Sequence, residues 1–257
     1  METVQLTRAD EVATLTIDRA AQLNSLDEAT LRALAARLVE LAASPPRVLL
    51  VRTAGERVFC AGADIQAMSE MSTDQARGFS ELGHATLDAL EALRCPVVAV
   101  VQGAALGGGL ELVLACDLVL ASRRARFGLP ETNLGLIPGF GGCSRLARRV
   151  GVGLARELIY SGRILSADEA DRAGLITRLV DAEALAADAE RFAAELTTRP
   201  PLALARAKVA LRAAETSDAR SAARVEIEAF GGLFGTDDTR EGLTAFLARR
   251  TPTFQGR

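Results

Sequence analysis

The sequence predicts one α/β domain of about 200 residues followed by a helical extension, which is an ordinary domain size. The chain has 257 residues, 49% of them hydrophobic and 25% charged, a balance typical of globular proteins with a substantial core. Short apolar segments of strand length alternate with segments of helical period up to residue 142, and mainly helical patterns follow. No period of 20–50 residues repeats, and no low-complexity linker divides the chain.

The first half of the chain alternates expected strands with expected helices. VQLT and VATLTI alternate apolar and polar residues around a turn at 8–11, as half-buried strands of a hairpin do. Asp27 precedes a segment whose leucines recur at helical spacing, and Pro45-Pro46 ends it. The expected elements are strands at 4–7, 12–17, 47–53 and 97–101, an extended segment at 58–64, and helices at 28–44, 65–71 and 74–93.

The second half is expected to be mostly helical. A strand at 118–122 and a glycine-rich loop at 134–142 come first. Ser166 is a candidate N-cap, and Gly174 a C-terminal stop, for a short helix. The expected helices are 154–162, 166–174, 182–197, 202–214, 219–233 and 237–249, the last four rich in alanine.

Charge and residue usage exclude several classes of function. A net charge of −3 gives no electrostatic reason to bind nucleic acid or an anionic membrane. No apolar run reaches the roughly 18 residues of a membrane helix, and the N-terminus lacks a signal pattern, so we expect a cytoplasmic protein. The four cysteines form no CxxC pair and are expected to be reduced thiols, not metal ligands. His84 is the single histidine, which disfavours histidine-based hydrolysis.

Glycines cluster in GAALGGGLELVLACDL at 103–118. Gly103 and Gly108 have Walker A spacing, but Gly109 and Leu110 stand where that motif requires Lys and Ser or Thr. GxGxxG and GxSxG are also missing here. Two interpretations remain: the glycines allow tight strand-to-helix packing, or they bring backbone N–H groups close to a developing oxyanion. In CAGAD at 60–64, Ala63 is a second candidate donor, and Asp64 a candidate N-cap.

Two carboxylates stand out from the other acidic residues. Glu111 lies in an otherwise apolar helix, so it is either a buried group tied to arginine or backbone amides, or a general acid or base with a raised pKa. Glu131 follows Pro130 in a long glycine-rich segment that can border a cleft. Two carboxylates beside oxyanion donors suit addition of water to an activated double bond. Glu70, Glu81 and Glu91 are expected to be solvated.

Several long motifs resemble the enoyl-CoA hydratase/isomerase (crotonase) family. They are CAGADI at 60–65, QGAALGGGLELVLACDLVLAS at 102–122, FGLPETNLGLIPGFGG at 127–142, LNSL at 23–26, SADEADRAGLI at 166–176 and TDDTREGLTAFLARR at 236–250. Their order and spacing also match. The resemblance implies a spiral of ββα repeats over 1–195 that carries the active site. It also implies a helical region over 196–257 that forms a homo-oligomer, a trimer or a dimer of trimers.

The resemblance further implies an acyl-CoA substrate. The backbone N–H groups of Ala63 and Gly108 would bind the thioester oxygen, Glu111 would activate water, and Glu131 would protonate C2. The implied enzyme is an enoyl-CoA hydratase of fatty acid β-oxidation, a lyase in which coenzyme A is part of the substrate, with no metal and no other cofactor. The implied substrate-binding positions are Leu26, Ala61, Asp64, Ile65, Ala104, Gly107, Pro130, Leu134, Gly139, Phe246 and Arg249.

Some residues depart from the family pattern. Leu129 stands where some hydratases carry glutamine, so a different partner is expected to orient Glu111. AAQLNSL lacks the Pro and Lys often found there, and Arg249 stands where lysine is frequent. The acyl pocket is expected to depend on Met68, Met71, Phe79, Leu82 and Phe140. The alternatives are an enoyl-CoA isomerase, a branched-chain (methylglutaconyl-type) hydratase, and a non-catalytic acyl-CoA-binding subunit.

Overall fold

In the computed structural model, which describes residues 2–257, the chain begins with the β-hairpin that the sequence predicts. β1 (Val4–Ala9) pairs antiparallel with β2 (Val12–Ile17), and β2 continues into a sheet of six strands. The order of that sheet is β1-β2-β3-β5-β7-β10, with all pairs after the hairpin parallel. Its later strands are β3 (Val48–Thr53), β5 (Val97–Val101), β7 (Leu118–Ser122) and β10 (Arg178–Val180).

A smaller second sheet has the order β4-β6-β8-β9. Its strands are β4 (Val58–Cys60), β6 (Ala104–Leu106), β8 (Arg126–Gly128) and β9 (Leu165–Ser166). The chain visits the two sheets alternately: β3 then β4, β5 then β6, and β7 then β8, with helices after each pair. This succession is the expected spiral of ββα turns. The repeat is not visible in the sequence because each turn keeps the geometry with different residues.

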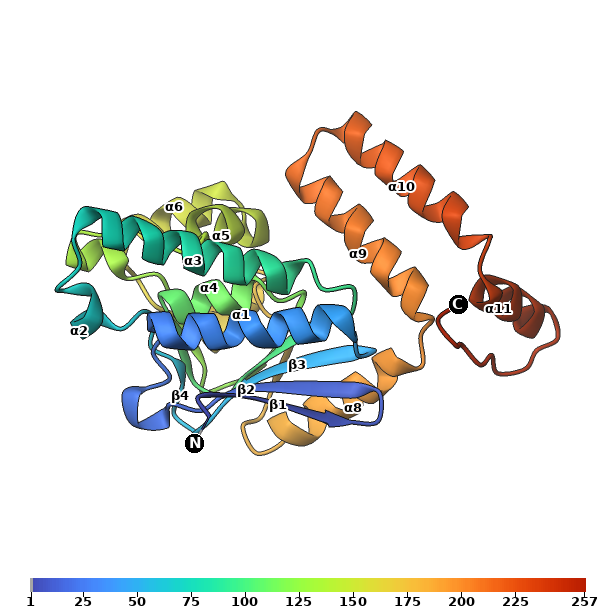
Figure 1. The fold of residues 1–257 in the computed structure, drawn as a ribbon, viewed down its shortest axis with the longest axis horizontal. Coiled ribbons are helices and arrows are strands. Elements are labelled where there is room, and N and C mark those ends of the chain that lie inside the picture. The colour runs from blue at the N-terminus through green and yellow to red at the C-terminus, as the bar shows by residue number, and fades with distance from the viewer. Residues whose placement is uncertain (1) are drawn as a thin grey trace.

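Helices fill the space between and around the sheets (Figure 1). They are α1 (Glu28–Ala43), α2 (Ile65–Met68), α3 (Thr73–Glu91), α4 (Gly108–Leu114), α5 (Gly142–Val150), α6 (Val152–Ser161), α7 (Ala167–Arg172), α8 (Leu185–Thr197), α9 (Pro201–Thr216), α10 (Ala219–Leu233) and α11 (Asp237–Leu247), with 3-10 turns at Ala20–Gln22 and Glu131–Leu134. The expected caps are confirmed: Asp27 accepts a hydrogen bond from Thr30 N, and Ser166 accepts one from Glu169 N. Gly174, with φ +76°, follows the end of α7.

The large sheet is covered on both faces. The main core contains the buried leucines of α1 (Leu31, Leu34, Leu38 and Leu41), which lie with Leu15, Leu49 and Val51. A second cluster forms where Leu185, Ala189, Phe192 and Ala193 of α8 lie against Val48, Leu50 and Val98. This second cluster explains why β3 and β5 are apolar almost throughout, because both faces of these strands are buried.

The last three helices form an arm (α9, α10 and α11) that extends from one end of the body (Figure 1). α9 and α10 run side by side, and the arm exposes many large hydrophobic side chains. They are Val209, Leu211, Ile227, Phe230, Phe234, Leu243, Phe246 and Leu247. The division of the chain at 195/196 stays a prediction. Within residues 2–257, the helices lack the combination of length and apolar character that a bilayer span requires.

The expected long elements are found within a few residues of their predicted bounds, whereas β6, β8, β9, β10 and α5 were not predicted. The four strands have only two or three residues each, too few for an alternating pattern to be recognised. α5 begins at Gly142, the last residue of the expected glycine-rich loop, and continues through a segment for which no element was predicted.

Candidate active site

Two backbone N–H groups face one small space where α4 begins. Gly107 takes a φ of +52° before α4, and Gly62 takes a φ of +106° in the CAGAD segment. A Cβ added to Gly62 would lie 3.4 Å from Gly108 N, and one added to Gly108 would lie 3.4 Å from Ala63 N. Within residues 2–257, neither Ala63 N nor Gly108 N donates a hydrogen bond to another backbone group. The site therefore offers two free donors to one acceptor atom.

The CAGAD segment is fixed by the loop before α1. Leu26 N donates to Gly62 O at 2.8 Å, and Asp64 N donates to Leu26 O at 3.1 Å. Asp64 also caps α2, since its carboxylate accepts from Ala67 N at 3.2 Å, as predicted. Leu26 and Asp64 thus hold the Ala63 donor in place by main-chain pairing.

Two side chains that were not predicted from the sequence brace this loop. Asn24 Nδ2 donates to Ala54 O at 2.8 Å and to Val58 O at 3.2 Å. Arg19 pairs with Asp27 at 2.7 Å. Asn24 has a φ of +55°, a conformation that asparagine tolerates better than most residues. The sequence signal that could have revealed this role is an asparagine, Asn24, in a short loop just before Asp27, the N-cap of α1.

Glu111 is buried, with 1% of its surface exposed, on α4. Its Oε1 accepts hydrogen bonds from Phe140 N and Gly142 N, both at 2.7 Å. The pKa of Glu111 is raised to about 7: burial is the main cause, the two amide hydrogen bonds oppose it, and the charge of Glu131 adds to the rise. Both bonds go to Oε1, so Oε2 is left for other partners. The sequence left two alternatives for Glu111, hydrogen bonds to backbone amides or a raised pKa. The structure shows both.

Glu131 begins the 3-10 turn Glu131–Leu134 and points towards Gly107. A Cβ on Gly107 would lie 3.1 Å from Glu131 Oε1. Glu131 Oε2 is buried and has no hydrogen-bond partner among the described residues 2–257. Burial raises the pKa of this carboxyl group above its ordinary value. A buried oxygen without a partner favours the protonated form, which is able to donate a proton.

Two donors and two carboxyl groups therefore meet at the start of α4. A Cβ on Gly107 would lie 3.6 Å from Gly62 Cα as well as 3.1 Å from Glu131 Oε1. Glu111 N donates a hydrogen bond to Gly107 O at 3.0 Å, so both acidic residues adjoin Gly107. The arrangement can polarise a carbonyl group while one carboxylate removes a proton from water and the other delivers one.

The sequence profile described as Enoyl-CoA hydratase/isomerase matches residues 7–257. The chain belongs to the enoyl-CoA hydratase/isomerase family. It is 40% identical over 251 residues to the short-chain-enoyl-CoA hydratase of Clostridium acetobutylicum, covering 97% of this chain and 96% of that one. It is 39% identical over 254 residues to the crotonyl-CoA hydratase of Syntrophomonas wolfei, covering 98% of each.

Solved structures of the family have the same fold. The crystal structure of an enoyl-CoA hydratase from Bacillus anthracis matches with a TM-score of 0.95 and 38% identity, over 99% of this chain and 100% of that one. One from Geobacillus kaustophilus matches with a TM-score of 0.94 and 35% identity, over 99% and 98%. The expected crotonase-like α/β spiral is thereby confirmed.

In this enoyl-CoA hydratase/isomerase, main-chain groups orient Glu111. Leu129 is fully buried in the core, and the Phe140 and Gly142 amides orient Glu111 instead of a side-chain amide. A Cβ on Gly142 would lie 2.9 Å from Glu111 Oε1. Glycine at this position is therefore what lets the turn reach the carboxylate.

The side chains expected to form the acyl pocket lie together on the α2–α3 side of the site. Phe79 and Phe140 make an edge-to-face contact with ring centroids 5.2 Å apart. Phe140 borders the donor site directly, because a Cβ on Gly108 would lie 3.2 Å from its Cε2. Met68, Met71 and Leu82 are half-buried and pack against the core.

The other predicted substrate-binding residues fall into two groups. Ala61, Ala104, Gly107, Pro130 and Gly139 lie on the segments that carry the donors and the carboxyl groups, and Ile65 and Leu134 are exposed beside them. Phe246 lies in the last turn of α11 and Arg249 follows that helix. Since α11 belongs to the arm and lies away from the body (Figure 1), one chain does not bring these two residues to the glutamates. Their role towards substrate stays a prediction.

One expectation about acidic residues was wrong. Glu70 and Glu81 are exposed, as expected, but Glu91 has only 15% of its side chain exposed and is paired with three arginines. Helical position alone suggested a solvated face, because the arginines come from α5 and α9, far along the chain. Within residues 2–257, no group of His, Cys, Asp and Glu is arranged to hold a metal ion.

Proposed function

We propose that this protein is an enoyl-CoA hydratase, a hydro-lyase that adds water across the C2=C3 bond of trans-2-enoyl-CoA. The product is a 3-hydroxyacyl-CoA. The observation that carries the proposal is the pair Glu111 and Glu131, two carboxyl groups with raised pKa values beside the free N–H groups of Ala63 and Gly108. The relatives from C. acetobutylicum and S. wolfei are named as hydratases of this kind.

In the binding step, the thioester carbonyl oxygen accepts hydrogen bonds from Ala63 N and Gly108 N. These hydrogen bonds become stronger as the oxygen gains enolate charge, so they stabilise the transition state more than the bound substrate. Polarising the carbonyl group draws electron density from C3. That carbon becomes the electrophile that water attacks.

In the addition step, ionised Glu111 takes a proton from the water while the water oxygen bonds to C3. With a pKa of about 7, a substantial fraction of Glu111 is ionised near neutral pH and is still basic enough to accept the proton. Protonated Glu131 then delivers its proton to C2 as the enolate collapses. One water is consumed, and the two glutamates exchange their protonation states until solvent restores them.

Glu111 and Glu131 differ in environment in the way these roles require. Glu111 accepts two backbone hydrogen bonds, which favour its ionised form. Glu131 has a buried oxygen with no partner among residues 2–257, which favours its neutral form. A Δ3,Δ2-enoyl-CoA isomerase needs one carboxyl group to move a proton, and a non-catalytic acyl-CoA binder gains nothing from two buried acids. The pair therefore favours hydration.

Coenzyme A enters as part of the substrate, and the proposed mechanism uses no metal and no further cofactor. We also propose that the apolar surfaces of the arm associate in a trimer or a dimer of trimers, in which Phe246 and Arg249 of one subunit can approach the site of another. All four cysteines are unpaired, and three are buried, which fits a reducing compartment such as the cytoplasm.

The test is hydration of crotonyl-CoA, followed as loss of the enoyl absorbance. Glu111→Gln and Glu131→Gln should each lower kcat by about 10²–10⁴ while retaining affinity for a saturated acyl-CoA. Glu81→Gln, an exposed glutamate of α3, is the matched control and should behave as the parent. Absence of turnover with any enoyl chain length would contradict the proposal, and conversion of 3-enoyl-CoA without hydration would identify an isomerase.

A further inference from the structure

The turn at residues 140–142 determines how Glu111 is held. Its Phe140 and Gly142 amides are the two donors to Glu111 Oε1. The peptide unit between those amides carries the Phe140 carbonyl group. Arg145 Nη1 donates to that carbonyl oxygen at 2.5 Å. One guanidinium group therefore fixes the peptide unit that separates the two donors.

Arg145 is packed directly beneath this turn. It is 4% exposed. A Cβ on Gly141 would lie 2.2 Å from Arg145 Nη1, so the guanidinium group occupies the space that a side chain at 141 would need. Arg145 N also donates to Gly141 O at 3.0 Å, which closes the first turn of α5. The arginine and the turn form one packed unit.

Two acidic residues of α3 hold Arg145 in this position. Nη2 of Arg145 donates to Asp88 Oδ1 at 2.6 Å and to Glu91 Oε2 at 3.2 Å, and its Nε lies 3.2 Å from Glu91 Oε1. Such multiple bonds use the planar fork of the guanidinium group, which lysine cannot reproduce. The orientation of Arg145 is thus set from α3, independently of the turn.

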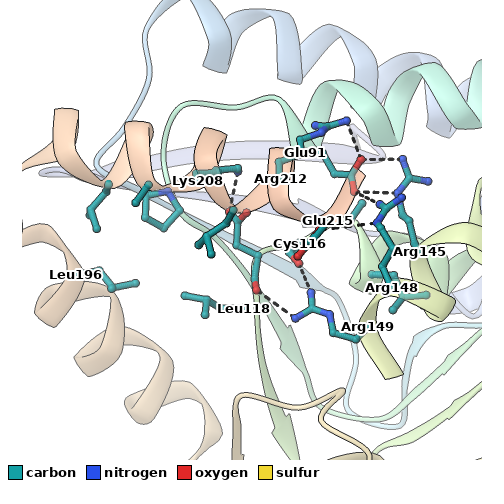
Figure 2. Close-up of a pocket in the computed structure, with 17 residues that line it drawn as sticks. Glu91, Cys116, Leu118, Arg145, Arg148, Arg149, Leu196, Lys208, Arg212 and Glu215 are labelled. Atoms are coloured by element: carbon teal, nitrogen blue, oxygen red, sulfur yellow. Dashed lines mark hydrogen bonds and ion pairs between the residues drawn. The ribbon is translucent and has the colours of Figure 1, made fainter. Parts of the chain in front are cut away.

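Figure 2 shows that Glu91 is shared among three arginines beside a cavity of about 430 Å³. Arg148 of α5 and Arg212 of α9 each reach Glu91 at 3.2 Å. Glu91 would therefore keep two cationic partners if Arg145 were replaced. Asp88 would keep its contact with water, because its side chain is 56% exposed.

We propose that Arg145 is a positioning residue for catalysis: by bonding the Phe140 carbonyl group, it holds the 140–142 turn so that two amides meet Glu111. It does not touch the reacting atoms. The inference rests on the proposed role of Glu111 as the base that activates water. Asp88 and Glu91 orient Arg145, and Arg145 orients the turn.

The titratable and charged groups around Glu111 come from three elements. Glu131 faces it from the 3-10 turn and raises its pKa, whereas Arg145 of α5 lowers it. Burial raises the pKa of Cys143 of α5, and the nearby charge of Glu111 adds to that rise. From α3, His84 lies against Gly141, and Asp88 and Glu91 surround Arg145. Removing the Arg145 cation should therefore raise the pKa of Glu111.

The test compares Arg145→Met with Arg145→Lys and with the matched control Arg148→Met, each in the full chain. Arg148 is also an α5 arginine bonded to Glu91, but its other contact is Glu215. In Arg145→Met we expect kcat for crotonyl-CoA to fall by about 10², the cost of a small misplacement of a catalytic group, with KM nearly unchanged. The acid limb of the pH profile should move to higher pH. Arg145→Lys should restore the acid limb but not kcat, and Arg148→Met should match the parent.

A second measurement follows Glu111 without turnover. Infrared difference spectra report its protonation as a carboxyl band that is lost in Glu111→Gln. In Arg145→Met this band should titrate at higher pH than in the parent. A folded Arg145→Met variant with parental kcat and parental titration overturns the proposal, and so does a loss of kcat with unchanged titration of Glu111. Normal hydration by Glu111→Gln would instead refute the assignment of the base, and the infrared titration separates these outcomes.

Discussion

Replacing Glu111 by glutamine should stabilise the fold at alkaline pH while it removes activity. The pKa of Glu111 rises from its ordinary value of 4.5 to about 7 in the folded protein. At about 1.4 kcal/mol per pKa unit, ionised Glu111 lowers the free energy of unfolding by about 3 kcal/mol. Glutamine has the same shape and keeps an oxygen that can accept from the Phe140 and Gly142 amides, but it carries no charge to desolvate.

The sign of this effect depends on pH. Below 4.5 Glu111 is protonated in both folded and unfolded chains, so its ionisation contributes nothing to stability. Between 4.5 and about 7 only the unfolded chain releases the proton, and the parent loses stability as pH rises. The advantage of the glutamine variant should therefore grow across this window and stay constant above it.

Urea denaturation at a fixed protein concentration, at the two ends of that window, measures the effect. Fixing the concentration is necessary because association of subunits adds to stability. Glu81→Gln serves as the control and should show no pH-dependent gain. If Glu111→Gln is equal to the parent or less stable at alkaline pH, then Glu111 is not held as a strained, desolvated acid, and the reasoning fails.

Further predictions concern rate, donor geometry and packing. The kcat for hydration should increase with pH through about 7 as Glu111 ionises, and the pH profile of the parent tests this. Gly108→Ala would place a methyl group 3.4 Å from Ala63 N and 3.2 Å from Phe140 Cε2, in the space proposed for the thioester oxygen, and should lower kcat by about 10²–10³. Gly83→Ala would bring a Cβ to 2.0 Å from Phe140 Cδ1, and should reduce the urea-derived free energy of unfolding by about 1–3 kcal/mol.

The sequence predicted the long elements because they carry periodic patterns. The leucines of α1 and the alternating residues of β2 follow the periods of a helix and of a half-buried strand, and their caps are explicit. β6 and β8 are too short for any pattern, and their partners lie in other turns of the spiral. Their positions follow from pairing with β4 and with each other, which only the assembled fold provides.

The sequence singled out the two proposed catalytic glutamates, but not the contacts that hold them. Glu111 was conspicuous as a charge in an apolar helix, and Glu131 as an acid in a glycine-rich segment. The contacts that hold Glu111 come from backbone atoms 29 and 31 residues away, and a backbone donor has no residue-specific signature. For the same reason Glu91 was misjudged: its arginine partners lie 54 or more residues further along the chain.

The two proposed oxyanion donors, Ala63 N and Gly108 N, are main-chain groups, so they respond to mutation differently from the two carboxyl side chains. A point mutation can obstruct a peptide N–H group but, short of proline, cannot delete it. The ability to stabilise an enolate is thus built into the chain path, whereas the acids at 111 and 131 can each be changed in one step. Protein engineering could therefore leave these two backbone donors unchanged and vary the surrounding side chains, so that the same enolate intermediate is converted to other products.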